Sequence, residues 1–421
     1  MAPKLSGKKE GSFAYRTVRD RWPQIITKLV NDLSTNKRAI IEMYGPEADE
    51  DVRAILEKFS RLRYRIMTDK SLDTLNDNED DVHEWNEFLL NNRTREIPDD
   101  VEQLTWFGGP WLFVECFLYR YIYGAFAATR KLKKMDYFED SKRTNFNDHL
   151  EQIEESSAFI MKISAEDAPV HELFGINTFL KMSLWGNRAD MSLTGGENAI
   201  VRMSAMSASS KLAEFVLVDD VNELIVKVLA PLLMNPENYS TRRIDIILDN
   251  AGVELAGDFV LAEFLISRGY ADKVVMHGKM MPWFVSDVTE RDFEWTLLAF
   301  SRAGVESARF GERLKKRVAD NQLEFKTHKF WTFPHAYYKM EEVAPDLHSE
   351  LKTSSLAIFK GDLNYPCRGF APCPFFALRI LKAETVAGLS KKVLDDILMK
   401  FDEDNGWMIS GTYAVCQLGG I

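Results

Sequence analysis

Polar side chains that could hold a metal ion follow an apolar segment near the middle of the chain. Residues 245–265 have the sequence DIILDNAGVELAGDFVLAEFL, in which a β-prone run ends at Asp249 and Asn250. Carboxylate and amide oxygens are hard ligands that suit Mg²⁺ or Mn²⁺. The same two residues can instead form a turn and cap the helix that follows. A metal site therefore requires that other segments bring similar residues to the same place.

Two further strand-like runs are followed by residues of the same kind. Asp287 comes after KVVMHGK, and LAIFKGDLNY carries Lys360 and several polar residues at its end. Because open parallel sheets bind ligands outside the carboxyl ends of their strands, we expect the three segments to meet at one crevice. Asp249, Asn250 and Asp287 would then hold a divalent ion, with positions left for water and a phosphate. Lys360 and Lys382 would supply further phosphate contacts.

Glu254 lies one helical turn beyond Asn250 in the predicted helix. It can face the same crevice, or it can be a favourable acid in the first turn of the helix. His277, His328 and His335 are widely spaced, so we interpret them as structural or surface residues.

The periodicity of apolar residues divides the chain into two parts. Residues 25–33 and 52–62 carry apolar stripes at helical spacing, and the apolar run 110–130 is long enough for a buried helix. From about residue 212 onward, β-rich runs alternate with helical stretches, which predicts a mostly parallel sheet covered on both faces. The Ser-, Gly- and Asn-rich segment 184–210 is the candidate boundary. We expect a mainly helical domain over 1–195 and an α/β domain carrying the site over 196–421.

Composition and missing motifs exclude several functions. The net charge of −11 argues against broad binding to nucleic acid. No run of eighteen apolar residues occurs, so no membrane span is predicted. The four cysteines form no CxxC pair, and no GxSxG, Walker A, HExxH or GxGxxG motif occurs. The basic N-terminus is not followed by the apolar run of a secretory signal. We expect a soluble protein of the cytoplasm, with the nucleus as a second compartment, and the oligomeric state is not predicted.

Several segments taken together resemble the acidic-residue methyltransferase / damage-control phosphatase family, most closely its third subfamily. They are LDNAGVELAGDFVLAEFL, HGKMMPWFVSDV, FKGDLNY and ALRILKAE, and RDRWPQII and PWLFVECFLYRYI extend the resemblance to the first half. The resemblance implies a Rossmann-like α/β domain of three layers with a mostly parallel sheet, preceded by an N-terminal helical domain. This agrees with the organisation expected from periodicity.

The resemblance also implies an activity and roles for particular residues. Family members are metal-dependent phosphatases of small phosphometabolites such as fructose 1-phosphate and fructose 6-phosphate. Asp249, Asn250 and Asp287 match the family's metal ligands and catalytic residues, with Mn²⁺, Mg²⁺, Co²⁺ or Ni²⁺ as the ion. The substrate-binding set joins Lys360, from the strand-end argument, to the residues that match family motifs: Glu254, Asp362, Asn364, Tyr365, Arg379 and Lys382.

Two alternatives to a phosphatase stay open. The family resemblance also implies methylation of protein glutamate side chains with S-adenosylmethionine as cofactor, although no glycine-rich loop for that cofactor is evident. A non-catalytic binding protein is the other alternative. It is suggested by Ile380, which stands where the family signature has threonine, and by Pro366, which stands where an arginine is usual.

Overall fold

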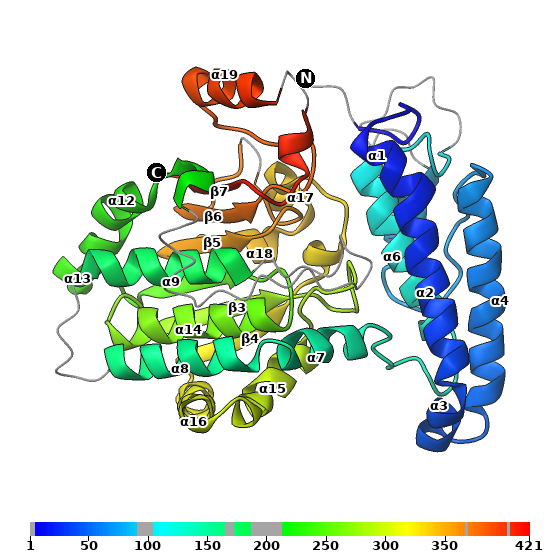
Figure 1. Cartoon of the computed structure of the whole chain (residues 1–421), viewed down its shortest axis with the longest axis horizontal. Coiled ribbons are helices and arrows are strands. Elements are labelled where there is room, and N and C mark those ends of the chain that lie inside the picture. The colour runs from blue at the N-terminus through cyan, green and yellow to red at the C-terminus, as the bar shows by residue number, and fades with distance from the viewer. Residues whose placement is uncertain (1–4, 91–103, 165–171, 187–212, 367–368, 402–404) are drawn as a thin grey trace. The chain divides into compact units, whose positions relative to one another are not determined.

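The computed structural model describes residues 5–90, 104–164, 172–186, 213–366, 369–401 and 405–421 (Figure 1). Its contacts divide the chain into two compact units. The first unit comprises Met1–Tyr137 with Met281–Phe284, and the second comprises Phe138–Met280 with Val285–Ile421. Within the described residues, no helix is long and apolar enough to cross a membrane.

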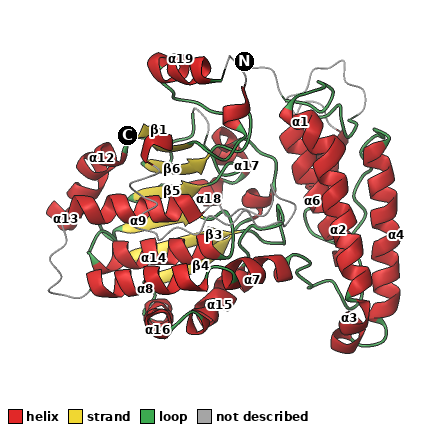
Figure 2. Cartoon of the chain, in the orientation of Figure 1, coloured by secondary structure: helices red, strands yellow, loops and turns green. Residues whose placement is uncertain are grey.

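The first unit is built from helices (Figure 2), and many of the side chains buried between them are aromatic. The stripe predicted over residues 25–33 is buried in its first long helix, and Trp22, Trp85 and Trp106 are also buried. Its α-helices are α1 (Phe13–Arg16), α2 (Trp22–Thr35), α3 (Lys37–Tyr44), α4 (Ala48–Met67), α5 (Val82–Leu90) and α6 (Trp111–Ala127). The predicted helical character of this part of the chain is confirmed.

In the second unit, the described residues contain seven strands that form one sheet, in the order β1-β7-β6-β5-β2-β3-β4. All neighbouring strands are parallel except β6 and β7. The strands are β1 (Val216–Asp219), β2 (Arg243–Ile247), β3 (Lys273–Gly278), β4 (Leu323–Thr327), β5 (Leu356–Lys360), β6 (Phe375–Ile380) and β7 (Ala414–Gly419). The predicted α/β class with a mostly parallel sheet is therefore confirmed.

Helices cover both faces of this sheet and make the three layers (Figure 1). Side chains alternate along a strand, so Ile244 and Ile246 pack into one core while Ile247 packs into the other. The first face carries α8 (Leu150–Ile163), α9 (Glu172–Gly186), α12 (Val221–Leu224), α13 (Ala230–Met234), α14 (Val253–Ser267), α15 (Glu290–Ala299) and α16 (Val305–Ala319). The opposite face carries α17 (Met340–Val343), α18 (Pro345–Leu351) and α19 (Lys391–Lys400).

The grouping of the helices before the sheet differs from the predicted division. Helices α7 (Glu139–Asn147), α8 and α9 belong to the second unit, because their apolar residues pack with α14 and α16. Periodicity identifies a helix but not its packing partner, so it does not distinguish these helices from those of the first unit. The predicted boundary at residues 195 and 196 lies outside the described residues.

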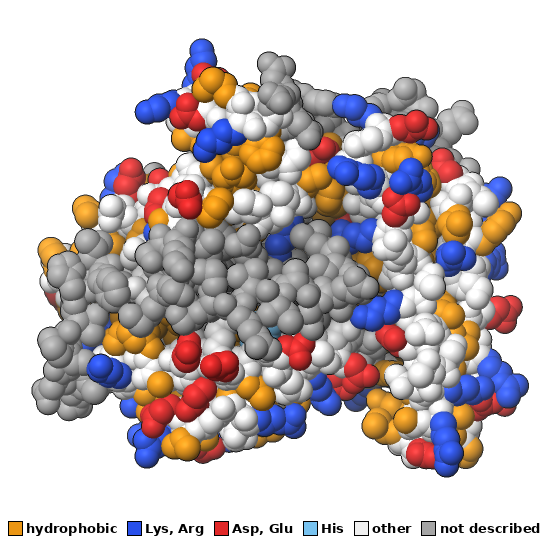
Figure 3. All heavy atoms as spheres, viewed as in Figure 1, with side chains coloured by type: hydrophobic (Ala, Val, Ile, Leu, Met, Phe, Trp, Pro, Cys, Tyr) orange, Lys and Arg blue, Asp and Glu red, His pale blue; other side chains and the backbone are white. Residues whose placement is uncertain are grey.

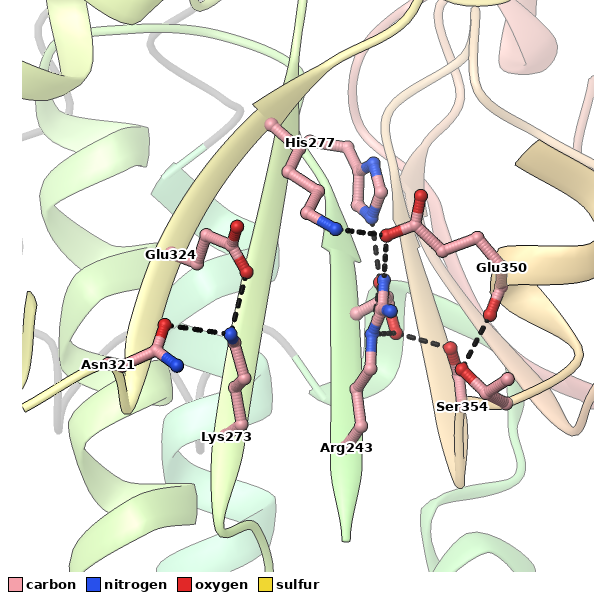
Figure 4. A network of polar contacts seen from close by, with 10 residues as sticks. Arg243, Lys273, His277, Asn321, Glu324, Glu350 and Ser354 are labelled. Atoms are coloured by element: carbon pink, nitrogen blue, oxygen red, sulfur yellow. Dashed lines mark hydrogen bonds and ion pairs between the residues drawn. The ribbon is translucent and has the colours of Figure 1, made fainter. Parts of the chain in front are cut away.

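A buried polar network joins β2 and β3 to the helical layer formed by α18 (Figure 4). The Asp245 carboxylate is fully buried, with His277 Nε2 at 2.7 Å from Oδ1 and Arg243 Nε at 3.0 Å from Oδ2. Ser354 also donates to this carboxylate, and Arg243 continues to Glu350. Burial alone would raise the pKa of Asp245, but the hydrogen bonds and charges of His277 and Arg243 outweigh it and lower the pKa.

The network predicts an acid-sensitive contribution to stability. Replacing Asp245 by asparagine is expected to reduce the free energy of unfolding at pH 7 by about 2 kcal/mol, because buried donors lose a charged acceptor. A lowered folded-state pKa stabilises the fold above the ordinary aspartate pKa, and this stabilisation is lost as the pH falls through the folded-state value. Urea denaturation should therefore show a difference between wild type and variant that shrinks toward acidic pH. The exposed control Asp320→Asn should show no such trend, and a pH-independent difference for Asp245→Asn would contradict the prediction.

Candidate functional site

The candidate site lies where the strand order of the sheet reverses direction. From β2 the chain continues outward to β3 and β4, then returns to β5 on the other side of β2. The crevice outside the carboxyl ends of two such strands is the usual ligand site of open α/β sheets. Asp249 follows β2 and Gly361 follows β5, so both lie at this position.

A short antiparallel bridge brings Asn250 and Asp287 together. Ala251 N donates to Ser286 O at 2.7 Å, and Val288 N donates to Asp249 O at 2.9 Å. These bonds flank the Asn250 and Asp287 pair, which is the arrangement in which opposite side chains approach most closely. The expected meeting of the residues after β2 and β3 is thus present in the structure.

Gly361 brings the backbone after β5 directly against Asp249. Its φ angle is +76°, and a Cβ atom at this position would lie 2.0 Å from Asp249 Oδ2. A side chain here would therefore meet both backbone strain and a steric clash. The carboxylate sits in a cradle of backbone that accommodates only glycine.

The donor set fits a hard divalent ion. Asp249, Asn250 and Asp287 are 8%, 4% and 2% exposed, and buried carboxylates are costly unless a cation compensates them. Among the described residues, no group of three or more His, Cys, Asp or Glu side chains is placed to hold a metal ion. The candidate set therefore consists of two carboxylates and one amide oxygen, which leaves positions for water or substrate oxygens. It stays a prediction that these three residues bind the ion.

The Asn250 amide links the ends of this set. Its Nδ2 donates to Asp249 Oδ2 at 2.9 Å and to Glu254 Oε2 at 2.8 Å, while its Oδ1 accepts from Ser286 Oγ at 2.5 Å. An amide oxygen has two lone pairs, so Oδ1 can accept from Ser286 and also bind an ion. Glu254 therefore lies at the site, where it orients Asn250 through this hydrogen bond.

Lys360 is turned into the protein. Its ammonium donates to Ser183 O at 3.0 Å, Glu254 Oε1 at 2.9 Å and Asp258 Oδ1 at 2.7 Å. An ammonium has three N–H donors, and all three are used. This geometry differs from the phosphate contact that we predicted for Lys360, because the neighbouring carboxylates of α14 lie within its reach. Its position instead fixes Glu254.

The pKa shifts in this cluster show how the charges are shared. Burial alone would lower the pKa of Lys360, but Asp258 and Glu254 outweigh it and raise the pKa. For Asp258, burial and the Glu254 charge outweigh the attraction of Lys360 and raise the pKa to about 6. Lys360 thus stays a cation, while two buried carboxylates compete for its charge.

Asn364 makes all of its hydrogen bonds within the protein. Its Nδ2 donates to Leu248 O at 2.8 Å and to Lys360 O at 2.9 Å. Its Oδ1 accepts from Lys279 Nζ at 2.9 Å and from Tyr337 OH at 3.2 Å. These bonds tie the loop after β5 to the ends of β2 and β3, and the substrate contact of Asn364 stays a prediction.

The remaining predicted residues form a second group at β5, β6 and β7. Arg379, on β6, is buried and donates to Asp362, and its guanidinium lies 4.4 Å from the centre of the Tyr365 ring. Tyr365 OH donates to Gln417 Oε1 at 2.5 Å. Lys382 is buried just beyond the end of β6. The group adjoins the candidate metal ligands through Gly361, which precedes Asp362.

Four residues of the site were missed in the sequence. Lys279 follows β3 directly, and its strand-end position could have indicated it. Asp258 lies four residues after Glu254, so helical spacing could have placed it on the same side of α14. Nothing in the sequence indicates Ser286 or Ser183. Ser286 donates to Asn250 and Ser183 donates to Asp258, and these contacts join segments that lie far apart along the chain.

The fold defines an α/β protein with a mostly parallel sheet, and the candidate site lies at the ends of its strands. Residues 17–398 match the model of the damage-control phosphatase ARMT1-like domain, and the chain belongs to this family. Relatives named damage-control phosphatase ARMT1 are 36% identical in Danio rerio, 36% in Mus musculus and 33% in Homo sapiens. The alignments cover 98%, 99% and 99% of this chain and 96%, 98% and 98% of the relatives.

A solved protein of the DUF89 family from Pyrococcus horikoshii aligns with 93% of this chain and 96% of its own. The identity is 14% and the TM-score is 0.42, so the family assignment does not depend on this alignment.

Proposed function

We propose that the chain is a metal-dependent phosphatase that hydrolyses small phosphorylated sugars such as fructose 1-phosphate or fructose 6-phosphate. The proposal rests mainly on the oxygen donors of Asp249, Asn250 and Asp287 at the point where the strand order reverses. Membership of a damage-control phosphatase family supports the same reaction class.

The residues of the site have distinct tasks in this proposal. Asp249, Asn250 and Asp287 would hold Mn²⁺, Mg²⁺, Co²⁺ or Ni²⁺, which supplies polarisation of the phosphoryl oxygens when it is bound. Glu254 and Ser286 orient the Asn250 amide from two sides. The burial of these groups strengthens their electrostatic interaction with a charged ligand, because little water screens it.

The reaction breaks the bond between phosphorus and the ester oxygen. A water oxygen is added to phosphorus, one proton of that water passes to the ester oxygen so that the sugar leaves as its alcohol, and inorganic phosphate is released. Lys382 would hold the phosphate together with the other residues of the second group, which are Asp362, Tyr365 and Arg379. On the face shown in Figure 3, acidic and basic side chains of the described residues are interspersed, which fits a small ligand better than an extended nucleic acid.

A phosphatase screen tests the proposal. Purified protein is freed of metal by chelation, supplied in turn with the four ions, and assayed for phosphate release from an aryl phosphate and from both fructose phosphates. We expect metal-stimulated release that a chelator abolishes. If no combination of ion and substrate gives turnover, the proposed function is wrong.

The methyltransferase alternative gains no separate support from the described residues. Calorimetric titration with S-adenosylmethionine tests it directly, since the reaction requires that this cofactor binds.

A further inference from the structure

We propose that Lys279 binds a non-bridging oxygen of the substrate phosphate and that Lys360 is a positioning residue. The inference deepens the proposed function and rests on it. It concerns two buried lysines at the ends of the two strands that flank β2, one directly after β3 and one that ends β5. The two ammonium groups contact different residues of the site: Lys279 contacts Asn364 and Asp287, and Lys360 contacts Glu254 and Asp258.

The difference lies in the number of N–H donors that each ammonium uses. Lys360 donates to three acceptors within 3.0 Å, so its donors are fully used. Lys279 has one described acceptor at hydrogen-bond distance, Asn364 Oδ1 at 2.9 Å. Its ion pair with Asp287 Oδ2 spans 3.6 Å, which is too long for a hydrogen bond. A buried ammonium with donors still to satisfy is suited to an anionic oxygen.

Asn364 fixes the place of the Lys279 ammonium. Its Nδ2 is held by two backbone carbonyls, of Leu248 and Lys360, so its Oδ1 must face Lys279. Tyr337 OH donates to the same oxygen at 3.2 Å and limits its movement further. The ammonium is thereby held next to Asp287, beside whatever group that carboxylate binds.

The charges around Lys279 indicate the class of ligand. Lys360 is matched by Glu254 and Asp258, whereas Lys279 faces the single carboxylate of Asp287 at 3.6 Å. An ion held by Asp287 would neutralise that carboxylate and leave the Lys279 charge for the ligand. The ion and the Lys279 ammonium would then be two cationic centres side by side. Such a pair favours a phosphomonoester dianion over a phosphodiester, which carries one negative charge.

Binding of inorganic phosphate tests the inference without any turnover. Calorimetry in the presence of Mn²⁺ compares wild type with Lys279→Met and with Lys279→Gln, which can retain the hydrogen bond to Asn364. We expect the dissociation constant of phosphate to rise by about 10- to 100-fold in both variants, because one charge-assisted contact is lost. The affinity for Mn²⁺ should not fall, since no metal ligand is removed. The KM for a sugar phosphate should rise in parallel.

Two controls make the comparison specific. Lys352 is half-exposed and pairs with Glu341, so the control variant Lys352→Met should bind phosphate like wild type. Lys279→Arg keeps the charge and should recover part of the affinity. Circular dichroism confirms folding, and the glutamine variant serves if the methionine variant is unstable.

The inference is overturned if folded Lys279→Gln binds phosphate as tightly as wild type, or if wild type with Mn²⁺ binds none. The proposed function fails by a different result, which is the absence of metal-stimulated turnover in wild type. The two failures are therefore measured separately.

Discussion

Replacing Asp249 by asparagine is expected to abolish most metal-stimulated phosphate release. The substitution preserves the shape of the side chain inside the Gly361 cradle but removes one of the two candidate carboxylate ligands. Loss of several kcal/mol of charge stabilisation corresponds to a fall in kcat/KM of about a thousandfold. Steady-state kinetics measures the loss, and calorimetric titration with Mn²⁺ should show weakened binding of the ion.

Asp320→Asn provides the matched control, because it makes the same change on an exposed residue at the end of α16. It should retain both the activity and the Mn²⁺ affinity of wild type. Activity that survives unchanged in Asp249→Asn would mean that the reaction occurs elsewhere or in a contaminant.

Replacing Lys360 by methionine is expected to destabilise the fold strongly. The side chain is fully buried, and its removal leaves Glu254 and Asp258 close together without their shared cation. Removing one partner of a buried ion pair costs about 3–5 kcal/mol in the free energy of unfolding. Urea denaturation at pH 7 measures this loss. Lys273→Met, which breaks a more exposed pair with Glu324, should cost less than about 1 kcal/mol.

A double-mutant cycle separates the charge effect from the loss of packing. Asp258→Asn removes one of the two competing carboxylate charges, so it should make Lys360→Met less costly. The combined loss in unfolding free energy is expected to be smaller than the sum of the two single losses. Additive losses would show that Lys360 contributes by packing and not by charge.

The framework of the site was predictable because it follows from general rules of parallel sheets. The apolar run before Asp249 predicts a strand covered on both faces, and the structure shows β2 buried between two helical layers. Polar residues after two such strands are expected at one edge of the sheet, and Asn250 and Asp287 indeed meet there.

The partners of the lysines were not predictable, because they depend on side-chain packing between distant segments. The sequence shows that Lys360 ends a strand, but not that Ser183 from α9 and two carboxylates from α14 surround its ammonium. The same limit applies to Glu115, which lies in an apolar helix and forms its ion pair with Arg21 at 3.3 Å. Its near neighbour Arg120 pairs instead with Asp77 and Asp81.

The saturated hydrogen bonding of Asn364 divides the site into two parts that can change independently. Before this residue, the chain is locked to the ends of β2 and β3, so a substitution there disturbs the proposed ion site. After it, the chain leaves that network and continues through Tyr365 and Pro366. In the proposed phosphatase, an insertion or deletion beyond Pro366 would therefore alter which sugar is accepted while the ion affinity stays the same. A proposed site divided in this way would let one bound ion serve a series of substrates.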